Sequence, residues 1–213
     1  MAFRSFTGIR WARTGRSLKK IRLPKQKRLP QILSHAEVRC ILAGIRNPIH
    51  RGCFRLIYAC VLRISEAAPL SVTAIDKTTG LLRVVGKGNK ERFVPVPRPV
   101  HESLRRMWQA QDHRDRRWLF PNSWRAGPLA PHVLVRTFAE AVTAADLPGG
   151  RRATPHTLRP ACATRLFEEK GDTRVVQLLP GHENIATTTI CTHLTEPPRA
   201  SLRQLLDKVM SGV

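Results

Sequence analysis

The sequence predicts a mostly α-helical fold with one small antiparallel β-sheet, an α+β domain. Helix signals recur from Ser34 to the C-terminal region. Only two short runs, residues 81–85 and 92–96, have the composition of strands, and they flank one turn-rich loop. Apolar residues make up 42% of the chain and charged residues 24%, which is typical of a globular protein with a sizeable core.

The first helix is expected to begin after Ser34, because Ser34-His35-Ala36-Glu37 has the pattern of a capping box. It should run to about Ile45. The second should cover residues 48–62, and a short third helix should start near Ile64. Further helices are expected over residues 98–111, 131–146, 155–170, 173–179, 184–190 and 199–210.

The two strands should form a hairpin around the loop 86–91. Pro95 indicates that the second strand is an edge strand, or that its backbone faces solvent there. In the C-terminal helix, an apolar set at 202, 205, 206 and 209 predicts packing on the core in cis, with docking on a neighbouring protomer as the alternative.

The net charge of the chain indicates which classes of partner it can bind. The 213 residues hold 37 Lys+Arg and 15 Asp+Glu, a net charge of +22. Such a surplus favours polyanions, with nucleic acid ahead of an acidic membrane surface. No run is long and apolar enough for a membrane span or a secretory signal. Five cysteines without a CxxC spacing disfavour a disulfide framework and a zinc knuckle, and they favour a reducing compartment. With nucleic acid as the favoured partner, we expect a bacterial cytoplasmic, nucleoid-associated protein.

The N-terminal stretch is strongly basic. Residues 1–36 contain ten Lys/Arg, and the first carboxylate is Glu37. We expect two regions: a basic arm or linker over 1–30 and one domain over 31–213. A disordered tail and an organellar transit peptide are alternatives for the arm. Its candidate DNA-binding residues are Lys19, Lys20, Arg22, Lys25, Lys27 and Arg28.

Five basic residues stand in unusual local settings: Arg63, Lys87, His156, Arg159 and His182. Each has an ordinary explanation alone; Arg63, for example, could simply pair with Glu66. Together, without clustered carboxylates or metal-ligand spacing, they suit metal-free phosphoryl transfer. Two guanidiniums can hold phosphate oxygens, a lysine can protonate a leaving oxygen, and a histidine can move the nucleophile's proton.

The motifs around these residues, in their order between Leu29 and Leu194, resemble the catalytic domain of the tyrosine recombinase (phage integrase) family. They are Arg63-Ile64-Ser65-Glu66, the loop Gly86 to Arg92, His156-Thr157-Leu158-Arg159, and Gly181-His182 followed by Thr187-Thr188 and Thr192-His193. Trp118-Leu119-Phe120-Pro121 also resembles a family segment.

The resemblance implies roles. Arg63 and Arg159 would bind the scissile phosphate of double-stranded DNA, and Lys87 would assist the leaving 5′-hydroxyl. His156 would act in proton transfer, and His182 would hydrogen-bond the phosphate. The family cleaves DNA through a 3′-phosphotyrosyl intermediate without metal or cofactor, and works with other recombinase protomers.

The sequence departs from the family at the nucleophile, where Cys191 stands in place of tyrosine. A cysteine sulfur lies several ångströms closer to the backbone than a phenol oxygen, and a misplacement of about 1 Å can cost on the order of 100-fold in rate. Cys191 would then be a small buried residue. The only tyrosine, Tyr58, is expected to be a core residue.

Three prolines lie beside the motifs. Pro160 is expected to disturb the helix that carries Arg159, at a cost of about 3 kcal/mol, whereas Pro69 and Pro180 could fall at helix ends. We expect no counterpart of the family's N-terminal core-binding domain, because about 30 residues are too few for a domain. Another chain could supply that clamp.

The expected function is therefore DNA strand exchange by an integrase of a mobile element. We expect this integrase to be truncated and impaired, and the sequence does not decide whether it turns over. A non-catalytic DNA-binding module is the alternative. A general RNA-binding protein, which would need neither Arg63 nor Arg159, is a third reading.

Overall fold

A computed structural model gives the fold, and the chain divides into the units Met1–Pro30 and Gln31–Val213. The structure describes only part of the second unit, residues 32–89, 91–111, 117–124, 127–170 and 196–210. The predicted helices at 173–179 and 184–190 lie outside these residues, as does the basic arm. No helix in the described ranges is long and apolar enough to cross a membrane.

The first two helices begin as the sequence predicts. Helix α1, His35–Gly44, starts with the capping box: the Glu37 N–H donates to Ser34 Oγ, and the Ser34 N–H donates to Glu37 Oε2. Helix α2, Pro48–Ala59, starts at Asn47, whose side-chain oxygen accepts from two backbone N–H groups.

Helix α2 ends earlier than predicted. We expected it to reach Leu62, but the last helical residue is Ala59. The chain turns at Val61, which adopts a left-handed backbone with φ of 51°. Because such a conformation cannot continue a right-handed helix, the backbone leaves α2 there and reaches helix α3, Ile64–Ala67.

The predicted hairpin is present. A 3₁₀ turn, η1 (Val72–Ala74), precedes strand β1, Leu81–Val85. Strand β2, Glu91–Pro95, pairs antiparallel with β1, in a register that sets Leu81 opposite Pro95. The two strands form a two-stranded sheet, and a 3₁₀ turn, η2 (Lys87–Asn89), lies in the loop between them.

The remaining described helices follow closely the predicted ranges. They are α4 (Arg98–Gln109), α5 (Pro131–Ala144), the 3₁₀ turn η4 (Pro155–Thr157) with α6 (Leu158–Lys170), and α9 (Glu196–Met210). A further 3₁₀ turn, η3 (Pro148–Gly150), was not predicted. Together with the two-stranded sheet they make a mostly helical α+β fold, as the sequence predicts.

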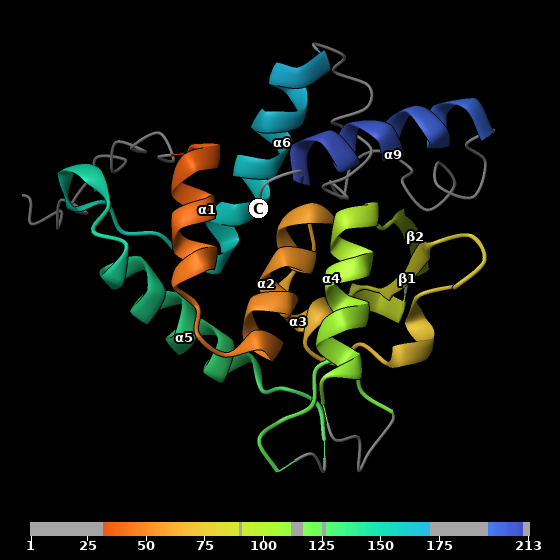
Figure 1. Ribbon diagram of the computed structural model, residues 1–213, viewed down its shortest axis with the longest axis horizontal. Coiled ribbons are helices and arrows are strands. Elements are labelled where there is room, and N and C mark those ends of the chain that lie inside the picture. Colours follow the sequence, from red (N-terminus) through yellow and green to blue (C-terminus); the bar gives the residue numbers. More distant parts are fainter. Residues whose placement is uncertain (1–31, 90, 112–116, 125–126, 171–195, 211–213) are drawn as a thin grey trace, which may run out of the picture. The chain divides into compact units, whose positions relative to one another are not determined.

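Helix α2 forms the centre of the core, with α1, α4 and α6 packed around it (Figure 1). From Gly52 to Leu62 every side chain is buried except that of Arg55. Tyr58 is fully buried, which confirms that it is a core residue. A helix buried on most sides must be apolar around most of its circumference, and this segment meets that requirement.

Helix α9 packs in cis on α6, α4 and β2, which confirms the expectation for the C-terminal apolar set (Figure 1). Leu202, Leu205, Leu206 and Val209 are all buried. The Asp207 carboxylate accepts a 2.6 Å hydrogen bond from the Arg98 N–H, at the start of α4. This contact is favourable because a helix N-terminus carries unpaired donors and a partial positive charge.

The prediction for Pro160 was wrong. The α-helix begins at Leu158, after the 3₁₀ turn η4, so Pro160 lies in its first turn. First-turn N–H groups have no intrahelical acceptor, and a proline there removes no helical hydrogen bond. Pro69 follows the end of α3 and is exposed, at a helix end. Pro180 lies outside the described residues.

Candidate functional site

The site begins where the chain leaves the buried helix α2. Val61 turns the backbone, the Leu62 N–H closes the turn on the Ile57 carbonyl at 3.1 Å, and Arg63 follows as the residue that precedes α3. Its side chain is 41% exposed. A left-handed backbone costs a non-glycine residue about 1–2 kcal/mol. The chain thus accepts strain at the turn that brings Arg63 from the core to the surface.

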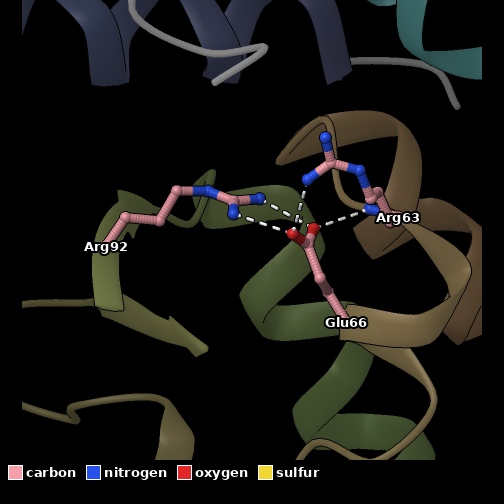
Figure 2. A network of polar contacts seen from close by, with 3 residues as sticks. All are labelled: Arg63, Glu66 and Arg92. Atoms are coloured by element: carbon pink, nitrogen blue, oxygen red, sulfur yellow. Dashed lines mark hydrogen bonds and ion pairs between the residues drawn. The ribbon is translucent and has the colours of Figure 1, made fainter. Parts of the chain in front are cut away.

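The carboxylate of Glu66 organises this site. Its side chain is only 4% exposed, on α3. The Arg63 N–H donates to Glu66 Oε2 at 2.8 Å, and Arg63 Nη1 donates to Oε1 at 3.2 Å. Arg92, on β2, approaches from the other side and donates from both terminal nitrogens, each at 2.8 Å (Figure 2). Glu66 therefore ties α3 to the hairpin through a bidentate ion pair.

These contacts keep Glu66 ionised. Burial raises the pKa of Glu66, but the hydrogen bonds from Arg92 and from the Arg63 N–H, with the charges of both arginines, outweigh it and lower that pKa below its ordinary value. The carboxylate is the fixed negative centre around which the guanidiniums are arranged.

A third guanidinium belongs to the same electrostatic site. Arg159 is the second residue of α6 and is half-buried. Burial, and next the charge of Arg63, lower the pKa of Arg159; Glu66 opposes them and Arg92 adds to them. The structure thus brings together Arg63 and Arg159, which are 96 residues apart in the sequence. The charges of Arg63, Arg92 and Arg159 all act at this site, and a group of guanidiniums suits a bound anion.

Lys87 and His156 lie on segments next to these arginines in the sequence. Lys87 opens η2, in the loop that leads into β2 and Arg92. Gly88 and Asn89, with φ of 75° and 57°, are the left-handed residues of this tight loop. His156 lies in η4, three residues before Arg159, and its side chain is exposed.

The other predicted site residues are not described. His182 and Cys191 lie within 171–195, and Lys19, Lys20, Arg22, Lys25, Lys27 and Arg28 lie within 1–31. Among the described residues, no group of three or more His, Cys, Asp or Glu side chains could hold a metal ion.

Sequence reasoning missed two residues of this site. Glu66 was considered only as an ordinary partner of Arg63, and the structure confirms that contact while adding Arg92 to it. The signal for Glu66 was its position three residues after Arg63, the spacing of a capping box. Arg92 carried no such signal, because the alternation of side chains along a strand predicts which face of the sheet a residue lies on and not which residue it contacts.

Comparison with known proteins identifies relatives of this fold and site. The model of the phage integrase family matches residues 25–197. The tyrosine recombinase XerD of Caulobacter vibrioides is 34% identical over 205 residues, covering 90% of this chain and 67% of the relative.

Two solved structures have the same fold. The integrase from mycobacterium phage Brujita superposes with a TM-score of 0.71 at 26% identity, over 90% of this chain and 66% of that one. The lambda integrase catalytic core has a TM-score of 0.59 at 22% identity, over 71% of this chain and 91% of that one. The chain spans about two thirds of the length of the XerD and Brujita proteins, and most of that catalytic core.

Proposed function

The chain belongs to the phage integrase family of tyrosine recombinases, and from that premise we propose that it binds double-stranded DNA and holds one phosphodiester for strand exchange. The observation that carries this proposal is the clustering of Arg63, Arg92 and Arg159 around the single carboxylate of Glu66. Guanidinium groups gathered at one site stabilise the charge that grows on phosphate oxygens in a transition state.

In the proposed reaction, Arg63 and Arg159 hold the two non-bridging oxygens, while Arg92 and Glu66 position Arg63. A nucleophile forms a bond to phosphorus as the bond to the 5′-oxygen breaks. His156 takes the nucleophile's proton, and Lys87 delivers a proton to the leaving 5′-oxygen. His182 donates a hydrogen bond to the phosphate. The roles of Lys87, His156 and His182 rest on the family resemblance.

The residue at the nucleophile position is the part of this reaction that fits the chemistry least well. Cys191 stands at the nucleophile position, and its sulfur reaches less far from the backbone than a tyrosine oxygen. A short reach misaligns attack on phosphorus, and misalignment of about 1 Å costs on the order of 100-fold in rate. We therefore propose that the chain keeps the phosphate-binding site but cleaves DNA slowly or not at all. The substitution at 191 also favours the alternative function, a DNA-binding module without catalysis.

The partners follow from charge. The basic residues of the arm, Lys19, Lys20, Arg22, Lys25, Lys27 and Arg28, would lie along DNA phosphates and contribute affinity by counterion release. Other recombinase protomers are proposed as further partners, because solved relatives include a lambda integrase tetramer on a Holliday junction. A cytoplasmic location on bacterial DNA is part of the same proposal.

A suicide substrate tests the proposal. A nicked DNA duplex that traps a covalent protein–DNA adduct is incubated with the wild type, Cys191→Tyr and Cys40→Tyr. Cys40 is exposed on α1 and provides a matched control for adding a tyrosine. We expect all three proteins to bind DNA, and an adduct to accumulate with Cys191→Tyr alone.

The outcomes separate the two functions. An adduct with Cys191→Tyr means that only the nucleophile limits cleavage, whereas binding without any adduct favours the non-catalytic module. Arg159→Gln should weaken DNA binding in either case. Affinity for DNA that is unchanged in Arg63→Gln and Arg159→Gln would contradict both functions.

A further inference from the structure

A basic cavity lies between α2 and α4, which pack side by side (Figure 1). Its volume is about 300 Å³. Three arginines converge on it, Arg51 and Arg55 from α2 and Arg106 from α4. The residues between them are small or flexible: Gly52, Ser103 and Met107.

Helix periodicity places these side chains on facing surfaces. Arg51 and Arg55 are four residues apart on α2, and Ser103 and Arg106 are three apart on α4, so each pair shares a face of its helix. Gly52 places no side chain in the cavity, and a Cβ atom built there would lie 2.7 Å from Sδ of the flexible Met107 side chain. The arginines thus surround one concavity.

The charges in this cavity are unbalanced. Among the residues that the structure describes, no carboxylate forms an ion pair with Arg51, Arg55 or Arg106. Arg55 Nη1 donates to Ser103 Oγ at 2.9 Å, and its Nε–H is buried without an acceptor in the described part of the chain. Burial, and then the charges of Arg51 and Arg106, lower the pKa of Arg55. Bringing three cations together is unfavourable unless an anion joins them.

We propose that this cavity is a second anion site, which binds a phosphate group through Arg51, Arg55 and Arg106. Guanidinium groups bind phosphate oxygens with two parallel hydrogen bonds, and the cavity has room for one phosphate. The residues that line this cavity include none of Arg63, Arg92 and Arg159. The phosphate bound here is therefore not the one held by Arg63 and Arg159.

The bound phosphate group could belong to either of two ligands: a phosphodiester of bound DNA away from the strand-exchange position, or a small phosphate compound. The variant Arg106→Gln tests for binding of each ligand at this cavity. Arg105→Gln is the matched control, because Arg105 is the adjacent exposed arginine of α4, has the same charge, and lines a different cavity.

The first arm measures the melting temperature against inorganic pyrophosphate at constant ionic strength. We expect a saturable rise for the wild type and for Arg105→Gln. Arg106→Gln should need about tenfold more pyrophosphate, because it loses a charged hydrogen-bond donor. The Arg106-dependent part of the rise should persist in Arg63→Gln, which separates this site from the proposed strand-exchange site.

The second arm measures DNA affinity against salt concentration. If the source is DNA, the slope of log K against log salt should fall by about 0.9 in Arg106→Gln and stay unchanged in Arg105→Gln. A response to pyrophosphate with an unchanged DNA slope would assign the site to a small phosphate compound. If Arg106→Gln and Arg105→Gln behave alike in both arms, the proposal is overturned.

Discussion

Removing the carboxylate of Glu66 should destabilise the protein markedly. Glu66 accepts four hydrogen bonds, two of them from Arg92, whose side chain is only 17% exposed. Glu66→Ala leaves Arg92 facing Arg63 and Arg159 without a counter-charge. Breaking a buried ion pair costs about 3–5 kcal/mol, and the exposure of Arg63 places the expected loss near the lower end, about 3 kcal/mol.

The free energy of unfolding, measured by urea denaturation, checks this value. At about 2–4 °C per kcal/mol for a chain of this size, the melting temperature should fall by about 6–12 °C. Glu91→Gln is the control, because Glu91 pairs with Arg83 on the exposed side of the hairpin and should change stability little. A loss in Glu66→Ala no larger than that in Glu91→Gln would refute the role given to Glu66.

The same carboxylate predicts a pH dependence. The pKa of Glu66 is lower in the folded protein than its ordinary value of 4.5, so its contribution to stability is complete above about pH 4.5. That contribution is lost as the pH falls through the lowered folded pKa. Urea midpoints measured from pH 6 downwards should therefore decline below about pH 4.5, and Glu66→Gln should remove part of this decline. Parallel curves for both proteins would contradict this assignment.

Three further predictions concern the core. Val61→Gly should be more stable than Val61→Ala by about 1 kcal/mol in urea denaturation, because Val61 has a positive φ, which glycine adopts without strain. At ordinary positions the glycine variant is the less stable of the two, and finding that order here would rule out strain at Val61. Tyr58→Phe should unfold within about 1 kcal/mol of wild type and leave any DNA adduct on gels unchanged, because the one hydrogen bond of its hydroxyl within the described residues is a 3.3 Å contact with His35 Nδ1. Leu206→Ala should cost about 2–5 kcal/mol at every protein concentration, because Leu206 is fully buried in cis; a concentration-dependent loss would instead indicate docking between protomers.

Local signals predicted most of the described fold because they act over a few residues. The capping box at Ser34, the strand 81–85 and the apolar set of the last helix needed no knowledge of distant residues. The effect of Pro160 was predicted wrongly because it does not depend on the local sequence alone. Its cost depends on which residue starts the α-helix, and the 3₁₀ turn before Leu158 moved that start by three residues.

The site was predicted in part. Motif order made Arg63 and Arg159 candidates, but their arrangement depends on contacts between segments far apart in the chain. Arg92 joins Glu66 only because the hairpin packs beside α3, and no spacing in the sequence expresses that contact. The basic cavity likewise depends on the packing of α2 against α4, which brings Arg51, Arg55 and Arg106 around one concavity.

The sequence by itself determined the helices, the hairpin, the positive surplus and the chemical types available for phosphate binding, because caps, periodicity and charge are local or additive properties. Only the tertiary structure decided which charges meet. Whether a guanidinium is solvated, paired with Glu66 or left facing like charges depends on the packing of α2, α3, α4, α6 and β2, since electrostatic energy depends on distance and burial rather than on position along the chain.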